Sequence, residues 1–342
     1  MKQRRDTTMD VAKGFGMLAV ILAHIITGDF KVFLYSFHLP LFFIISGYFF
    51  NCNDNFKTFF LKKCRSYLIP YFSCSLIVSL YAFLHTGFNL NVLREFIFKF
   101  LIQQRFQTLW FLAALFGAVM IFRGICTICK DNLKLIIPLS CCLSFIFLLY
   151  DYYVKQPLIW NLDTACISVF FLMVGYVFKK KNFISTLLSQ TKKQKVWLLF
   201  LFIIIDIFCT SFNMNFGFAS LEMFDSCYGF VPLTMLAAIF GTLAVIILAS
   251  LMYDFKPLIW IGQNTMTFFA FHQYIALTMA TQISAYIPLI NGYSPLANFF
   301  NKFFLFVVTI TICIIFHVVI INCHCGFILG KKAAPKPKHQ KR

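Results

Sequence analysis

Long apolar segments, separated by short polar and basic stretches, run along almost the whole chain. A helix needs roughly 17–25 mostly apolar residues to cross a bilayer, and ten windows approach or exceed that length. Their approximate extents are Met9–Ile26, Phe33–Phe50, Ser66–His85, Thr108–Phe122, Leu133–Tyr150, Leu162–Phe178, Val196–Phe212, Gly229–Tyr253, Leu258–Ala285 and Phe303–Leu329. The pattern predicts an all-α, polytopic integral membrane protein with about ten transmembrane helices.

One segment between the third and fourth windows has a different pattern. In Asn89–Gln107, apolar residues recur at helical spacing with Arg94, Lys99 and Arg105 between them. This predicts an amphipathic helix in the membrane interface on the outer face. Such a helix either has no part in chemistry or forms the rim of an acceptor site.

The composition excludes a soluble globular protein. Hydrophobic residues make up 60% of the 342 residues and charged residues 12%, whereas soluble domains are about 25% charged. Most of the 13 cysteines lie within apolar runs, where cysteine is typically a small buried hydrophobe. The run Cys323-His324-Cys325 does not match structural zinc spacings, so we expect no metal site.

The distribution of basic residues predicts the orientation. If the N-terminus is cytoplasmic, most of the 30 Lys and Arg residues fall in cytoplasmic segments, as the positive-inside rule requires. We therefore expect a multi-pass protein of the inner (plasma) membrane with both termini in the cytoplasm. Residues 1–330 form one membrane domain, and residues 331–342 a basic disordered cytoplasmic tail. The net charge of +18 fits contact with anionic lipid, and its spread over separate segments argues against nucleic acid.

The first apolar window contains two ionisable residues, Lys13 and His24. Their spacing places them on one helix face, within about 20° and about 16 Å apart along the axis. An ionisable group at a helix centre in lipid costs roughly 2.5–3.5 kcal/mol, so such groups usually face a bundle interior or a wet cavity. Alternatively, Lys13 pairs with Asp10 one turn earlier and extends to the cytoplasmic surface.

Further histidines lie at His38, His272 and His317. A short loop joins the first two windows, so His24 and His38 should lie at similar depth and line a cavity near the outer leaflet. An imidazole has an unperturbed pKa of about 6.5, which suits a general base. Each histidine is also compatible with a packed side chain bonded to a backbone carbonyl, and we keep that interpretation for His317. Asp206 serves either a proton path or a hydrogen bond between helices.

Several local motifs follow one another in order along the chain. They are D-x-x-K-G-x₉-H, FHLPLFFIISGYFF, KKCRSYLIPY, LWFLAALF and IGQNTMTFFAFHQY. From Asp6 to Leu329, this series resembles the acyltransferase type 3 family of integral membrane O-acyltransferases. The fucose 4-O-acetylase-like branch is the most similar.

The resemblance implies an enzyme, an O-acetyltransferase. It would move an acyl group, usually acetyl, from acyl-CoA to a hydroxyl of a cell-surface or capsular polysaccharide or its lipid-linked precursor. Acyl-CoA is then a co-substrate, and no tightly bound cofactor is expected. The partners expected are acyl-CoA, the glycan acceptor and membrane lipids.

The resemblance also assigns roles to individual residues. Lys13 and His24 match the family's basic-x₁₀-His catalytic pair, with Lys where many members have Arg, whose planar fork binds oxyanions in a bidentate manner. His38 joins the catalytic set. The basic residues Lys62, Lys63 and Arg65 would meet the CoA phosphates. Asp10, Trp110 and His272 would support the site or position the acceptor.

Two other functions remain open from the residues alone. Intramembrane Lys, His and Asp also fit a transporter or flippase for a polysaccharide precursor. A non-catalytic subunit of a glycan assembly complex is the other alternative. Release of CoA by the purified protein separates the enzyme from both.

Overall fold

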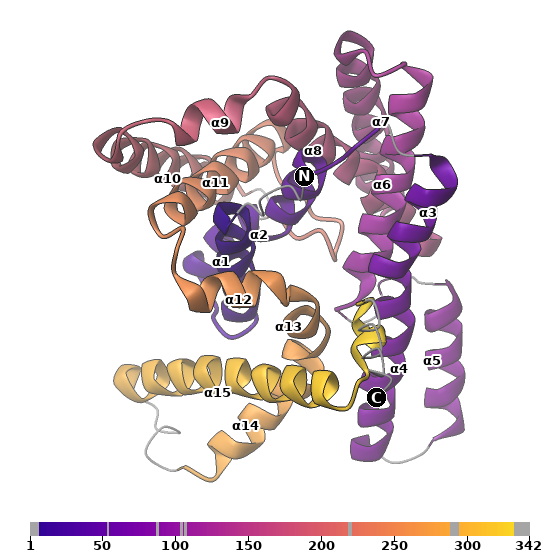
Figure 1. Cartoon of the computed structure of the whole chain (residues 1–342). Helices are drawn as coiled ribbons and strands as arrows, with labels where there is room; N and C mark the ends of the chain where they lie inside the picture. Colours follow the sequence, from indigo (N-terminus) through magenta and orange to yellow (C-terminus); the bar gives the residue numbers. More distant parts are fainter. Residues whose placement is uncertain are drawn as a thin grey trace, which may run out of the picture.

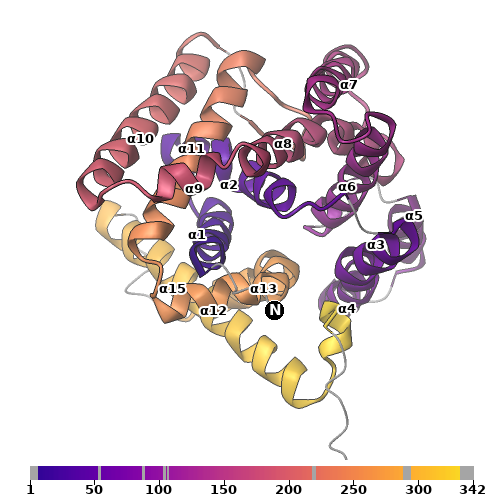
Figure 2. The same cartoon turned by 45° about the horizontal axis from the view of Figure 1, so that its top comes forward.

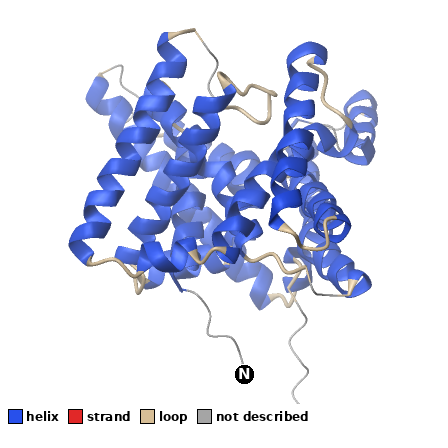
Figure 3. Ribbon diagram, turned by 90° about the horizontal axis from the view of Figure 1, so that it is seen from above, coloured by secondary structure: helices blue, strands red, loops and turns tan. Residues whose placement is uncertain are grey.

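The computed structural model describes residues 7–52, 55–86, 89–102, 105, 108–217, 221–287 and 294–331. These residues form helices, with one isolated bridge between Glu222 and Cys227 (Figure 3). The α-helices are α1 Thr7–Ala23, α2 Asp29–Tyr48, α3 Phe56–Lys63, α4 Ile69–Thr86, α5 Leu90–Ile102, α6 Trp110–Ile128, α7 Leu133–Val154, α8 Leu162–Lys180, α9 Phe183–Leu188, α10 Lys192–Asn215, α11 Val231–Leu251, α12 Lys256–Gln263, α13 Thr265–Phe271, α14 Thr278–Ala285 and α15 Pro295–Asn322. The predicted all-α, polytopic membrane fold is confirmed.

Eight helical segments of the described chain are long and apolar enough to cross a membrane. They are Asp29–Tyr48, Phe56–His85, Trp110–Ile128, Leu133–Val154, Ile159–Lys180, Lys192–Asn215, Val231–Leu251 and Pro295–Asn322. The remaining two predicted windows are present in other forms: α1 has 17 residues, and the ninth window is divided. The total of ten spans stays a prediction.

The ninth window consists of four consecutive pieces. Between α12 and α13, Asn264 leaves helical geometry, and its side-chain amide donates to the carbonyl of Trp260 (2.8 Å). A π-helical turn, η3, then covers His272–Leu277 before α14. Such π turns widen the helix locally and are frequent at functional sites. The divided segment therefore presents His272 from an irregular stretch of backbone.

Helices α1 and α2 lie in the middle of the bundle. Helix α1 contacts α2, α11, α12 and α13, and α2 contacts α8 and α11 (Figure 2). The outer helices α5, α7, α10 and α15 surround them, and α15 crosses beneath α12 and α13 in Figure 1. This central position keeps the polar side chains of α1 and α2 away from lipid.

The two ends of the described chain lie at the same end of the bundle. Gln263, the last residue of α12, donates to Asp10 near the start of α1 (3.1 Å). The next residue, Asn264, accepts a hydrogen bond from Lys331 Nζ (2.8 Å). This geometry fits the expectation of termini on one side, and the cytoplasmic assignment stays a prediction. The tail expected at residues 331–342 lies outside the described residues, except for Lys331.

A very close helix contact joins α2 and α8 through two glycines. A Cβ added to Gly47 would lie 2.0 Å from the carbonyl oxygen of Leu172, and one added to Gly175 would lie 1.9 Å from that of Ile44. Small residues at such positions allow membrane helices to approach closely, which lipid itself does not drive. This contact fixes α2, and therefore His38, relative to α8.

We predict that Gly175→Ala separates α2 from α8 and lowers the thermal stability of the purified protein in detergent. Overpacking of this kind typically costs about 1–3 kcal/mol. Gly124→Ala is the matched control, because a Cβ there meets nothing within 4 Å. Thermal unfolding of the three proteins is the measurement, and a melting temperature of Gly175→Ala equal to that of the wild type would contradict the close approach.

Candidate functional site

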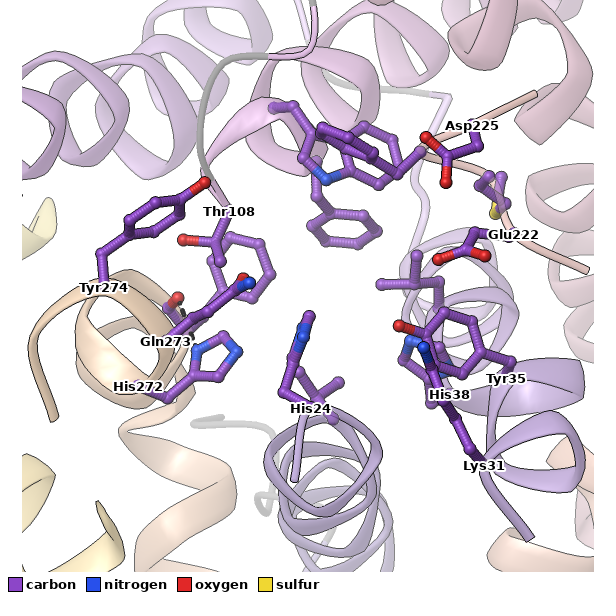
Figure 4. A pocket seen from close by; sticks show the side chains of 17 residues that line it. His24, Lys31, Tyr35, His38, Thr108, Glu222, Asp225, His272, Gln273 and Tyr274 are labelled. Carbon is purple, nitrogen blue, oxygen red and sulfur yellow. Dashed lines mark hydrogen bonds between the residues drawn. The ribbon is translucent and has the colours of Figure 1, made fainter. Parts of the chain in front are cut away.

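Three histidines from three separate elements meet in one cavity of about 350 Å³. We call it the histidine cavity. Its polar lining consists of His24, Lys31, Tyr35, His38, Thr108, Glu222, Asp225, His272, Gln273 and Tyr274. Figure 4 shows His24 in the middle, with His272 on one side and His38 on the other. The prediction that His24 and His38 line a common cavity agrees with this geometry, and His272 joins them.

His24 is the residue directly after α1. Its ring is half-buried and lies beside that of His272, with centroids 5.1 Å apart and planes inclined by 46°. Two imidazoles this close cannot both carry a proton charge without strong mutual repulsion. The pair therefore suits an arrangement in which one imidazole accepts a proton while the other stays neutral.

His38 and His272 are held by backbone carbonyls. Nδ1 of His38 lies 2.9 Å from the carbonyl oxygen of Leu34, and Nδ1 of His272 lies 2.9 Å from that of Phe268. Because a carbonyl only accepts, Nδ1 is the protonated nitrogen in both rings, and Nε2 is the acceptor in the neutral form. Nε2 of His272 is buried without a hydrogen-bond partner. His38 and His272 are therefore each bonded to a backbone carbonyl and also line the cavity. The two interpretations drawn from the sequence hold together for both residues.

The loop between α10 and α11 brings carboxylates to the histidine cavity. Glu222 and Asp225 line it opposite the α13 side, with Lys31 of α2 nearby (Figure 4). Burial raises the pKa of the Glu222 carboxyl, Asp225 raises it further, and the Lys31 ammonium acts in the opposite direction. Reciprocal backbone hydrogen bonds between Glu222 and Cys227 (2.8 and 3.0 Å) close the loop. Sequence analysis did not identify these acids.

Arg105 fixes this loop to α8. Its guanidinium forms a buried ion pair with Asp163, and the two side chains are only 9% and 0% exposed. It also donates to the carbonyl of Met223 (2.9 Å) and to Ser226 Oγ (2.6 Å). A buried ion pair persists when its remaining hydrogen-bonding groups are also satisfied, as they are here. The sequence pattern placed Arg105 on an amphipathic helix that either has no part in chemistry or forms the rim of an acceptor site, whereas α5 ends at Ile102, before Arg105. No pattern singled out Asp163.

Trp110, the first residue of α6, lines the histidine cavity next to this ion pair. The Arg105 guanidinium lies 5.7 Å from its ring centroid, and the ring of Phe224 packs edge-on at 5.9 Å. The predicted supporting residue therefore forms part of the cavity wall and contacts the loop.

Lys13 lies in a second, mostly apolar cavity of about 190 Å³, the lysine cavity. Its ammonium donates to Oδ1 of Asp10 (3.1 Å), and Asp10 is 2% exposed. The pairing of Lys13 with Asp10 agrees with one of the alternatives drawn from the sequence. The cavity lining is Lys13, Met17, Phe42, Ser46, Tyr67, Phe111, Leu112, Leu115, Thr265, Met266 and Phe269.

The lysine cavity and the histidine cavity share two residues, Phe111 and Phe269. The centroids of these two rings are 5.3 Å apart. Lys13 and His24 therefore lie in neighbouring cavities with an aromatic pair between them, and not in one open channel.

The basic residues before the third predicted span line a third cavity of about 380 Å³, the basic cavity. Lys62 and Lys63 end α3, and Arg65 lies in the π-helical turn η1 (Cys64–Leu68). The Arg65 guanidinium donates to the carbonyls of Gly330 (3.3 Å) and Lys331 (3.1 Å). Arg65 thus holds the end of the described chain, whereas the two lysines carry most of the cavity's positive charge.

The basic cavity adjoins the lysine cavity. Phe49 lines the basic cavity, and the Lys13 ammonium lies 5.8 Å from its ring centroid. Tyr67 lines the lysine cavity, and Lys63 Nζ lies 5.3 Å from its ring. The three cavities follow one another from the end of the bundle that holds both chain ends toward the loop between α10 and α11. Among the described residues, no group of three His, Cys, Asp or Glu side chains is placed to hold a metal ion.

Two other intramembrane polar residues lie outside these cavities. His317 is packed as expected, but its Nδ1 lies 2.7 Å from the side-chain hydroxyl of Thr267 and is not bonded to a backbone carbonyl. Asp206 of α10 accepts from Ser36 of α2 (2.9 Å) and Thr210 (3.2 Å). Of the two alternatives for Asp206, the hydrogen bond between helices is the one that the structure contains.

Comparison with known proteins gives one match. Neither the curated proteins nor the solved structures contain a match to the chain. The fucose 4-O-acetylase-like branch therefore stays a prediction. A family model described as an acyltransferase domain, however, matches residues 6–318, which include every lining residue of the three cavities except Gly330. The chain therefore belongs to the acyltransferase type 3 family of membrane acyltransferases.

Proposed function

We propose that this protein transfers an acetyl group from acetyl-CoA to a hydroxyl of a cell-surface or capsular polysaccharide or its lipid-linked precursor. The observation that carries the proposal is the convergence of His24, His38 and His272 in a cavity next to the one that contains Lys13. A base toward the acceptor and a cation toward the donor are what O-acylation across this bundle requires.

His24 acts as the general base in this proposal. The acceptor O–H gives its proton to a ring nitrogen of His24, and the oxygen attacks the thioester carbonyl carbon. As the new C–O bond forms, the C–S bond breaks, and the CoA thiolate takes the proton back from His24. A two-step route, in which the acyl group is first bonded covalently to a ring nitrogen of His24 and then passes to the acceptor oxygen, uses the same residues. His272 at 5.1 Å and the carbonyl-held His38 position the base and the acceptor.

The donor binds from the opposite end of the bundle. Lys62 and Lys63 meet the CoA phosphates in the basic cavity, because compact ammonium groups bind phosphate as point charges. Arg65 makes a smaller contribution, since its guanidinium already serves two backbone carbonyls. The pantetheine arm then crosses the lysine cavity, and the thioester reaches the histidine cavity when Phe111 and Phe269 move apart.

Lys13 assists this passage by charge. Its ammonium is oriented by the buried Asp10, which also accepts a hydrogen bond from Gln263 (3.1 Å). A single positive charge can polarise the amide or thioester oxygens of the donor without the bidentate geometry of Arg. The lysine thus fits a supporting role on the donor side.

We predict that His24→Ala lowers acetyl transfer by about 10²–10⁴-fold, which is the usual contribution of a general base. The measurement is acetyl-CoA-dependent release of CoA thiol by the purified protein with a membrane glycan fraction. His85→Ala, at an exposed position of α4, is the matched control and keeps full activity. Wild-type rates from His24→Ala at equal protein amounts would remove His24 from the mechanism.

The donor site predicts a difference between two substrates. The double variant Lys62→Ala, Lys63→Ala should raise KM for acetyl-CoA about tenfold or more, because charge-assisted hydrogen bonds contribute about 1.5–3 kcal/mol. KM for S-acetylpantetheine, which lacks the nucleotide phosphates, should change less than twofold. The exposed pair Lys192→Ala, Lys193→Ala is the control. An equal rise in KM for both donors would show that these lysines do not bind phosphate.

A third prediction concerns Lys13. Lys13→Ala should lower kcat/KM for acetyl-CoA by about tenfold to a hundredfold, whereas Lys13→Arg keeps the charge and retains most of the activity. Steady-state kinetics with varied acetyl-CoA is the measurement, with exposed Lys57→Ala as the control. Unchanged kcat/KM in Lys13→Ala would mean that Lys13 only anchors α1 through Asp10.

A further inference from the structure

A separate cavity of about 770 Å³ lies on the other side of the loop between α10 and α11. We call it the Asp151 cavity. Its ionisable and aromatic lining comes from Arg105, Asp151, Tyr152, Lys155, Phe224, Asp225 and Tyr228. Phe224 and Asp225 also line the histidine cavity, so this loop is a wall that both cavities share. A ligand long enough to pass this wall would occupy both.

The Asp151 cavity contains buried polar atoms that have no hydrogen-bond partner. Asp151, in the last turn of α7, is 3% exposed, and neither of its carboxylate oxygens is hydrogen-bonded. The hydroxyl of Tyr228, which is 6% exposed, also has no partner. Ser226 and Tyr228 lie near the Asp151 carboxylate, and Thr164 lies near the Tyr228 hydroxyl. None of these contacts has the distance and angle of a hydrogen bond. Burying such groups unpaired is costly, so these atoms point to a ligand that supplies the missing hydrogen bonds.

The nearest cation cannot supply them. The Arg105 guanidinium is already engaged by Asp163, Ser226 and the carbonyl of Met223. Because Asp163 neutralises the charge of Arg105, the remaining charged side chains of the cavity are the carboxylates of Asp151 and Asp225 and the ammonium of Lys155. This balance disfavours an anionic ligand such as a phosphate and favours a neutral hydrogen-bond donor.

The remaining lining fits a sugar ring. Carboxylate oxygens accept hydrogen bonds from hydroxyls, and the Tyr228 hydroxyl can donate to one or accept from one. The rings of Phe224 and Tyr152 are 39% and 70% exposed and offer apolar faces for the C–H side of a sugar. The volume lies within the range of about 300–1,000 Å³ that is typical of small-molecule sites.

We propose that the Asp151 cavity is a saccharide subsite. It binds the sugar next to the one whose hydroxyl enters the histidine cavity, with Asp151 and Tyr228 as hydrogen-bonding residues. The inference rests on the proposed acetyl transfer to a glycan, and it assigns the acceptor to the class of oligosaccharides, not monosaccharides. The glycan passes Phe224 and Asp225, which line both cavities, between its two bound sugars.

The test uses Asp151→Asn and Tyr228→Phe, which remove hydrogen-bonding capacity but no bond present in the structure. Matched controls are Asp254→Asn, exposed and outside this cavity, and Tyr150→Phe, whose hydroxyl donates to the Gln156 carbonyl outside the cavity. Thermal unfolding should show no loss of stability in Asp151→Asn, Tyr228→Phe and Asp254→Asn, and at most a small loss in Tyr150→Phe, which removes one exposed hydrogen bond. The acceptor probes are size-fractionated oligosaccharides and monosaccharides, prepared by mild acid hydrolysis of the source cells' surface polysaccharide.

Acetyl transfer from radiolabelled acetyl-CoA is measured with each fraction. We expect Asp151→Asn and Tyr228→Phe to lower kcat/KM for the oligosaccharides about tenfold. Values for the monosaccharides and KM for acetyl-CoA should stay within twofold of the wild type. An unchanged ratio of oligosaccharide to monosaccharide kcat/KM would overturn the subsite and leave the proposed acetyl transfer standing.

Retention of fluorescently labelled oligosaccharide by the protein without acetyl-CoA is measured in parallel by equilibrium dialysis. Retention that Asp151→Asn weakens, together with no transfer to any fraction, would support the subsite and reject acetyl transfer as the function. No retention by the wild type and no transfer to any fraction would overturn both.

Discussion

A hydrocarbon surrounding offers no hydrogen-bond partner, and this constraint accounts for the position of the polar side chains that join α1 and α2 to their neighbours. Asp10 joins Lys13 to Gln263 of α12, and Asp206 joins α10 to Ser36 of α2. The central helices α1 and α2 contain a polar residue in each of these contacts, so the demand for partners holds them in the middle of the bundle. The lysine cavity and the histidine cavity lie along the same two helices, which supply Lys13, Lys31 and His38 to them.

The helical architecture was predictable from apolar length alone, but the irregular backbone was not. Leu258–Ala285 has the composition of one continuous span, yet Asn264 interrupts it by bonding its own helix and a π turn begins at His272. Hydropathy averaged over the length of a span does not locate either event, because the apolar residues around Gln263–Thr265 and around His272 and Gln273 outweigh these short polar runs. Likewise α1 is helical only to Ala23, which places His24 after the helix and not on its last turn.

The candidate site, too, was only partly predictable from the sequence. The meeting of His24 with His38 followed from a short connection between antiparallel neighbours, which is a local argument. The contribution of Glu222 and the pairing of Arg105 with Asp163 depend on the loop between α10 and α11, which packs against residues far away in sequence. No spacing rule connects such residues. The one signal for Glu222 and Asp225 is the presence of acidic residues in a mostly apolar loop, which alone does not indicate where the loop packs.

The aromatic pair between the lysine and histidine cavities has a consequence for the energy supply of the cell. Phe111 and Phe269 are in contact, with ring centroids 5.3 Å apart, so no column of water runs between these two rings. Hydrophobic constrictions of this kind stop ions by dewetting. A membrane that carries a transmembrane voltage can therefore hold this protein, with the lysine cavity on one side of these rings and the histidine cavity on the other, without a proton leak along this route.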